Sequence, residues 1–151
     1  MGNPSDQTDY IAGFISNIQT VLNNYKDYIG VHVIETNDDV YIPRYPAITI
    51  EYDSSTEEWK EIPRRKTLIA NFSISYYCAD INDRAVREKT RVGLSKICNT
   101  LRENWDLNDY CPQLGAHITS SIPYVLMKGE SIVAGGVITL QCRKVIDVVL
   151  T

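Results

Sequence analysis

The segment that decides the fold is residues 66–78, which read KTLIANFSISYYC. Apolar residues occupy every second position from Leu68 to Cys78, and small polar residues alternate with them between positions 71 and 75. This period of two is typical of a β-strand with one buried face. Residues 45–52 alternate in the same way, so the two segments predict a pair of neighbouring antiparallel strands.

The connection between these strands, residues 53–63, is polar and long. Its composition differs from that of a tight two-residue turn. We therefore expect a protruding hairpin whose tip is an irregular loop.

Two segments show the three-and-four spacing of amphipathic helices, residues 8–25 and residues 83–104. Thr8 or Ser5 is the expected cap of the first helix, and the polar cluster 80–83 precedes the second. One face of the second helix is predicted to be buried. Its residues are Val86, Thr90, Gly93, Leu94, Ile97 and Leu101.

The remaining strand patterns are residues 31–34, 116–127 and 132–149, with a turn at 128–130 and an irregular segment at 105–115. The adjacent glycines Gly135 and Gly136 predict a bulge or sharp bend. The element order predicts an α+β fold: a largely antiparallel β-sheet with two main α-helices packed on it and a protruding β-hairpin. We expect one domain over residues 1–151, with residues 1–7 as a flexible N-terminal arm.

Charge and composition exclude several classes of protein. The chain has 151 residues, with 15 basic and 19 acidic side chains and a net charge of −4, whereas non-specific nucleic-acid binding needs a basic surplus. No apolar run approaches the roughly 18 residues of a membrane-spanning helix. Because the first residues also lack the pattern of a secretory signal, we expect assembly in the cytoplasm and no contact with a membrane.

Motifs for catalysis are scarce. The four cysteines are scattered without a Cys-x-x-Cys pair, and His32 and His117 lie in strand patterns. We therefore expect no catalytic residues, no cofactor and no metal site, and we interpret Cys78 and Cys142 as apolar core residues.

One candidate surface is an arginine stripe on the second helix. Four arginines fall on one side of the helical wheel, and residues 83–103 hold six basic and three acidic side chains. The stripe is either an ordinary solvated helix face or a surface that binds carboxylates, which arginine pairs with in a bidentate manner. Its residues are Arg84, Arg87, Arg91 and Arg102.

The hairpin is the second candidate surface. It combines acidic residues with a tryptophan, which either folds back onto its own sheet or anchors an interface. The candidate residues are Glu57, Glu58, Trp59, Glu61 and Ile62. Together the two surfaces indicate association between identical chains, placed head to tail.

The order of segments also resembles a known family. The stretch 44–52, RYPAITIEY, precedes the acidic hairpin, and the strand 67–78, the helix beginning at Asn82 and the final strand with residues 141–145, QCRKV, follow. This order resembles the tail terminator (tail-to-head joining) proteins of long-tailed bacteriophages. The resemblance implies a virion structural protein without enzymatic activity, assembled in the host cytoplasm. It further implies a ring, expected to be a homohexamer, that caps the tail tube and stops its polymerisation.

The partners implied by the resemblance are other copies of the chain, the tail tube protein and a head-completion or connector protein. DNA is expected to pass through the lumen without specific binding. An alternative in the same class is another neck, head-completion, tail-completion or tube protein. A rival from another class is a small cytosolic α+β enzyme or ligand-binding domain that uses His117 or Cys98. Arginines near Cys98 would lower the pKa of its thiol.

Overall fold

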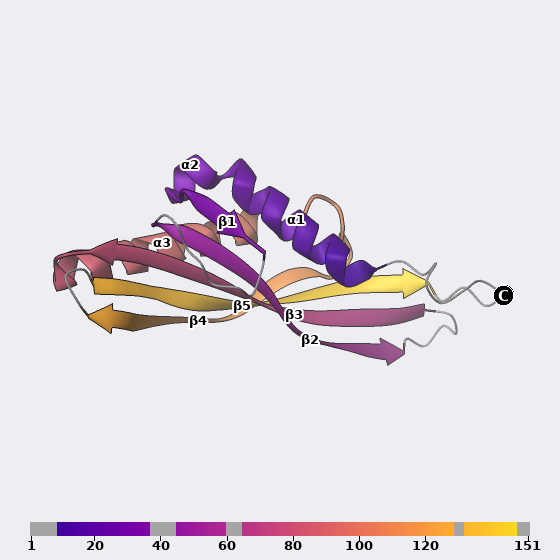
Figure 1. The fold of residues 1–151 in the computed structure, drawn as a ribbon. Helices are drawn as coiled ribbons and strands as arrows, with labels where there is room; N and C mark the ends of the chain where they lie inside the picture. The colour runs from indigo at the N-terminus through magenta and orange to yellow at the C-terminus, as the bar shows by residue number, and fades with distance from the viewer. Residues whose placement is uncertain (1–8, 37–44, 60–64, 129–131, 148–151) are drawn as a thin grey trace.

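The computed structural model of the chain describes residues 9–36, 45–59, 65–128 and 132–147. The central strand of its sheet is β3, Arg65–Asp80. Strands β2 (Ala47–Trp59) and β5 (Ile132–Asp147) flank β3, and both are antiparallel to it. Figure 1 shows that β2, β3 and β5 run most of the length of the molecule.

Two further pairings complete the sheet. Strand β4 (Gly115–Lys128) is antiparallel to β5, and β1 (Val33–Glu35) is parallel to the beginning of β2. The sheet order is β1-β2-β3-β5-β4. The predicted α+β class with a mostly antiparallel sheet is therefore confirmed.

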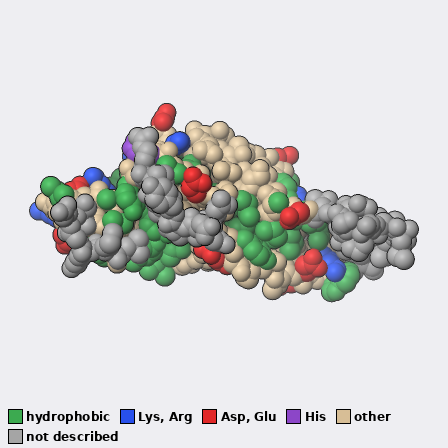
Figure 2. Space-filling view, in the orientation of Figure 1, with side chains coloured by type: hydrophobic (Ala, Val, Ile, Leu, Met, Phe, Trp, Pro, Cys, Tyr) green, Lys and Arg blue, Asp and Glu red, His purple; other side chains and the backbone are tan. Residues whose placement is uncertain are grey.

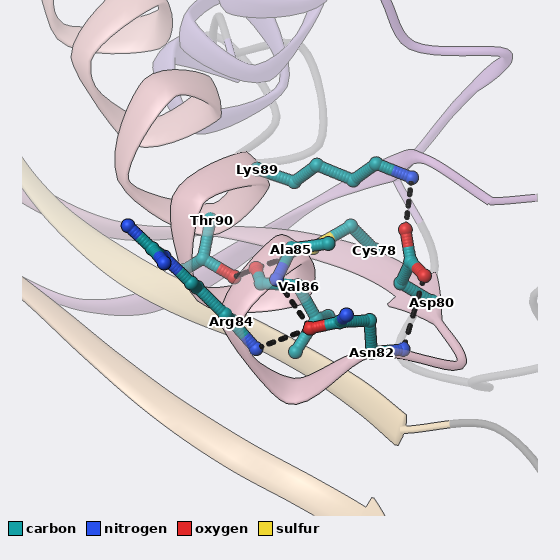
Figure 3. Close-up of polar contacts among 8 residues, drawn as sticks. All are labelled: Cys78, Asp80, Asn82, Arg84, Ala85, Val86, Lys89 and Thr90. Atoms are coloured by element: carbon teal, nitrogen blue, oxygen red, sulfur yellow. Dashed lines mark hydrogen bonds and ion pairs between the residues drawn. The ribbon is translucent and has the colours of Figure 1, made fainter.

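The helices are α1 (Tyr10–Asn24), α2 (Lys26–Ile29) and α3 (Asp83–Glu103). The predicted start of the first helix at Thr8 is wrong, because Asp9 is the N-cap and its carboxylate accepts a hydrogen bond from the Ala12 amide at 3.0 Å. At α3, the Asn82 side chain accepts hydrogen bonds from the amides of Arg84 and Ala85 (Figure 3). The predicted flexible arm at residues 1–7 lies outside the described residues.

The core lies between the sheet and the helices. All six residues predicted for the inner face of the second helix are buried, and α1 contributes Phe14, whose ring lies 5.8 Å from that of Phe72. The alternation in β3 also holds, since Phe72, Ile74 and Cys78 are fully buried beneath the helices. The free thiols of Cys78 and Cys142 are buried, as predicted for core residues.

The hairpin between β2 and β3 corrects one prediction. Residues 53–59, expected to be irregular, continue strand β2 as far as the pairing of Trp59 with Lys66. A register shift at Asp53 and exposure of every side chain from Glu51 to Trp59 remove the alternation that would have identified this strand. We call residues 51–59 the acidic strand.

The expected bulge at Gly135 and Gly136 is also wrong. Both residues pair in register with β3 and β4, and the register shifts of β4 lie instead between Ile118 and Ser120 and between Val125 and Met127. The two glycines allow neighbouring parts of the chain to pack closely against β5. A Cβ atom on Gly135 would lie 1.8 Å from the Tyr76 carbonyl oxygen. A Cβ atom on Gly136 would lie 2.6 Å from a methyl group of Leu94.

This packing predicts that Gly135→Ala lowers the free energy of unfolding by about 1–3 kcal/mol, the usual cost of overpacking a core. Because the clashing atom is a backbone oxygen, a side-chain rotation cannot relieve it. Urea unfolding followed by circular dichroism measures the change. Thr56→Ala on the exposed strand is the control and should stay within about 0.5 kcal/mol; equal losses in the two variants would contradict the packing argument.

Candidate functional site

A groove of about 920 Å³ lies between helix α3 and the edge strand β4. Its floor is apolar and includes Leu94 and Ala134, and its β4 wall includes Ser121, Pro123 and Val125. A volume of this size is within the range of ligand and peptide pockets. We call this feature the α3–β4 groove.

Three of the four predicted arginines line this groove, Arg87, Arg91 and Arg102. None of the described residues that line it is acidic, so the groove carries a positive potential. Arg87 forms an ion pair with Asp83 at 3.2 Å, and Arg102 donates a hydrogen bond to Asn99. Both partners are surface side chains, so these contacts constrain the arginines weakly.

The prediction that Arg84 belongs with the other three is only partly right. Arg84 is exposed in the first turn of α3 and does not line the groove. Figure 3 shows Arg84 and Lys89 extending to different sides of the helix, with Lys89 paired to Asp80 at 2.8 Å. The arginine surface therefore consists of Arg87, Arg91 and Arg102, on the part of α3 that faces β4.

The thiol of Cys98 behaves differently from the prediction. Cys98 lines the groove but is only 6 % exposed. Burial raises the pKa of its thiol, and the charge of Arg102 and a hydrogen bond with Ser121 offset this only in part. The expected lowering of the pKa by nearby arginines is wrong, because loss of solvent outweighs the distant guanidinium charge.

The hairpin surface is centred on Trp59, whose side chain is 68 % exposed. Lys66, its cross-strand neighbour, has its Nζ atom 4.1 Å from the centroid of the Trp59 ring and 3.3 Å from the Glu57 carboxylate. The Trp59 ring thus contacts the Lys66 side chain of its own sheet but is not buried there. Glu58 is exposed on β2 beside Trp59, and the remaining two residues predicted for this surface, Glu61 and Ile62, lie outside the described residues.

The acidic strand as a whole has four carboxylates and no basic side chain, at Glu51, Asp53, Glu57 and Glu58. Among the described strands, β1 pairs with β2 only as far as Thr49, so the outer edge of the acidic strand has no strand partner. Figure 2 shows charged and hydrophobic side chains together at the end of the sheet where β2 ends.

The groove and the end of the acidic strand, Glu57 to Trp59, lie toward different ends of one sheet. Trp59 pairs with Lys66 near the start of β3, whereas α3 begins three residues after the end of β3 at Asp80. Through the register of β5, groove residues Ser121 and Ala134 lie level with Ile74 and Cys78 of β3. At the usual rise of a strand, this part of β3 is about 25–40 Å from Lys66. Figure 1 shows the end of β2 and the start of α3 at opposite ends of the molecule.

The described hydrogen bonds of both histidines are with backbone carbonyl groups. The His117 ring makes a hydrogen bond with the Leu114 carbonyl at 2.8 Å, and the His32 amide donates to the Pro46 carbonyl. Within the described residues, no three His, Cys, Asp or Glu side chains gather into a metal-binding group. None of the helices described is both long and apolar enough to cross a membrane.

The sequence analysis did not identify the β4 residues that form one wall of the groove. Pro123 is typical of an edge strand, because proline has no amide to donate to a second neighbour. The exposed Ile122 and Val125 beside it, 56 % and 44 % exposed, mark β4 as an apolar edge. In the sequence, a proline within an otherwise apolar strand pattern was the feature that could have identified β4 as an edge strand.

The chain matches no protein-family model, and no curated protein matches it in sequence.

The buried thiols make stability depend on pH. Burial raises the pKa of all four cysteines, to about 11 for Cys111, whereas thiols of the unfolded chain titrate near 8.5. Above about pH 8.5 the unfolded chain loses protons that the native chain keeps, so the free energy of unfolding should fall as the pH rises toward 11.

Urea unfolding between pH 7 and 10.5 measures this fall. A Cys111→Ala variant should show a shallower dependence, because it lacks one of the titrating thiols. Stability that stays level across this range would contradict the assignment of buried, protonated thiols.

Proposed function

We propose that the chain is a virion structural protein of the tail terminator class, a subunit that assembles head to tail into a ring. The observation that carries the proposal is the separation of two complementary surfaces on one sheet. The basic α3–β4 groove lies beside the part of the sheet level with Ile74–Cys78 of β3, and the acidic strand ends at Trp59, opposite Lys66 near the start of β3. Figure 1 shows the end of β2 far from the start of α3. The family resemblance of the sequence supplies the particular biological setting.

The separation favours association between copies. An arginine guanidinium and a carboxylate pair only at short range, and strand β3 holds the end of the acidic strand about 25–40 Å from the groove. The surfaces therefore cannot satisfy one another within a single chain. Unlike surfaces on each copy produce heterologous contacts, which close into a ring when the rotation between neighbours allows it.

The proposed mechanism is geometric. A ring of the expected six copies would cap the tail tube, and one of its faces would block the addition of further tube subunits. The opposite face would receive the head-completion or connector protein, and DNA would pass through the lumen. The net charge of −4 per chain supports passage without adhesion, because like charges repel the DNA phosphates.

The rival enzyme hypothesis receives less support. Its nucleophile was Cys98, and burial raises the pKa of that thiol. A protonated thiol is a weak nucleophile. His117, the other candidate, has a ring nitrogen within hydrogen-bond distance of the Leu114 carbonyl oxygen.

Light scattering after size exclusion tests the proposal. The unaltered chain should form particles of several 17.1-kDa subunits at high protein concentration. The double variant Arg87→Glu/Arg91→Glu should remain monomeric, because its groove would repel the acidic strand, and its circular dichroism spectrum should be unchanged. Arg84→Glu/Arg143→Glu is the matched control, with the same charge change at exposed positions outside the groove, and should still assemble.

A complementary variant, Glu57→Lys/Glu58→Lys, sharpens the test. It should fail to assemble alone but should assemble when mixed with the groove variant, since each protein then offers a surface opposite in charge to its neighbour's. An unaltered chain that stays monomeric at millimolar concentration would overturn the proposal.

A further inference from the structure

We infer that the α3–β4 groove of one copy receives the end of the acidic strand of the next copy, with Trp59 as the apolar anchor in the groove. This inference rests on the proposed function, because it presupposes contacts between copies. It adds that Trp59 occupies the groove and that the acidic strand of the next copy lies along β4.

The floor of the groove fits an aromatic side chain. Leu94 and Ala134 form an apolar base, and Pro123 and Val125 form an apolar wall. Val125 is 44 % exposed in the single chain, and so is an apolar surface that a partner would cover. Trp59, 68 % exposed at the end of β2, is a large aromatic whose described ring contact is with the ammonium group of Lys66, 4.1 Å from the ring centroid. Docking of the indole in the groove would exchange this surface contact for apolar ones. Burial of an aromatic side chain removes about 150–250 Å² from water.

The charges around the floor fit the residues around Trp59. Along a strand, Glu57 and Trp59 point to the same side about 7 Å apart, and Arg87 and Arg91 are separated by about 6 Å along α3. An indole over the floor thus places the Glu57 carboxylate beside a guanidinium. Among the described contacts, the Glu57 carboxylate forms a surface ion pair with Lys66 at 3.3 Å, which costs little to exchange.

The backbone edges also fit. Among the described strands, β4 pairs on one side only, with β5, and the acidic strand pairs on one side only, with β3. Addition of one edge strand to another is a common mode of recognition, in which backbone hydrogen bonds supply affinity and side-chain pockets supply specificity. Pro123 has no amide to donate, so the hydrogen bonds of such a pairing would come from the β4 residues on either side of it. The groove lies directly beside the β4 edge, so a strand docked there brings its side chains to the pocket.

Photo-crosslinking from position 59 tests the inference. Benzoylphenylalanine in place of Trp59 keeps an aromatic group of similar bulk, and mixing labelled chains with ¹⁵N-labelled unaltered chains separates contacts between copies from contacts within one. We expect crosslinked peptides that contain residues 87–102 or 121–125 of the other copy. The same probe in place of Trp105, which is also exposed but lies outside the groove, is the control and should give at least tenfold less of these products.

Two substitutions measure the contribution of the indole. Trp59→Ala should raise the concentration for half-assembly by about tenfold or more, as truncation of an interface anchor does. Trp59→Phe, which keeps an aromatic ring, should raise it less. Because Trp59 is exposed in the single chain, both variants should fold normally, and circular dichroism checks this.

The possible failures are distinguishable. Assembly of the unaltered chain with crosslinks from position 59 to other surfaces would overturn the inference and leave the proposed ring intact; the groove would then be open to another partner, such as an acidic peptide of a tail or head protein. Equal assembly of Trp59→Ala and the unaltered chain would also overturn the inference. Absence of assembly by the unaltered chain would overturn the proposed function as well.

Discussion

The pairing of β3 with β5 is the constraint on which the rest of the structure depends. The two strands stay in register over sixteen residues, from Arg65 opposite Asp147 to Asp80 opposite Ile132. At Gly135 the backbone of β3 comes so close that no side chain fits, and at Gly136 the same lack of a side chain admits Leu94 of α3. A single long ladder thus fixes the position of α3 over the sheet, and with it the position of the groove relative to the far end of β2.

The two ends of the sheet differ in how their solvent-exposed backbone and side chains are stabilised. At the end where α3 begins, Asn82 caps the helix and Asp80 pairs with Lys89, so local polar contacts fix the first turn of α3 (Figure 3). At the other end, β2 extends as an exposed strand whose carboxylates keep it hydrated. Charged side chains are a usual protection for a free strand edge. The exposed aromatic Trp59 departs from this pattern, and such departures in otherwise consistent folds concentrate at functional positions.

Periodicity predicted the parts of the fold in which one face of an element is buried. The alternation around Phe72 and the inner face of α3 were correct, because burial imposes a period on the sequence. The end of β2 was predicted as an irregular loop, since all its side chains are exposed and no period remains. The groove combines α3 with Pro123 and Val125 of β4, residues that only tertiary packing brings to the helix. Cys98 was misjudged for the same reason: its spacing from arginines is visible in the sequence, but its desolvation is not.

The composition of the acidic strand has a consequence for the symmetry of any complex. If two copies joined through their β2 edges around a two-fold axis, the row from Glu51 to Glu58 would face an identical row. Carboxylates placed opposite one another across a strand pair repel, so the isologous dimer, the commonest closed arrangement of identical chains, is disfavoured from the outset. Electrostatic selection of this kind acts against pairing of two β2 edges and favours contact of the β2 edge with a surface that is not acidic. Higher ionic strength, which shortens the range of that repulsion, would weaken the selection and admit two-fold or fibrous by-products.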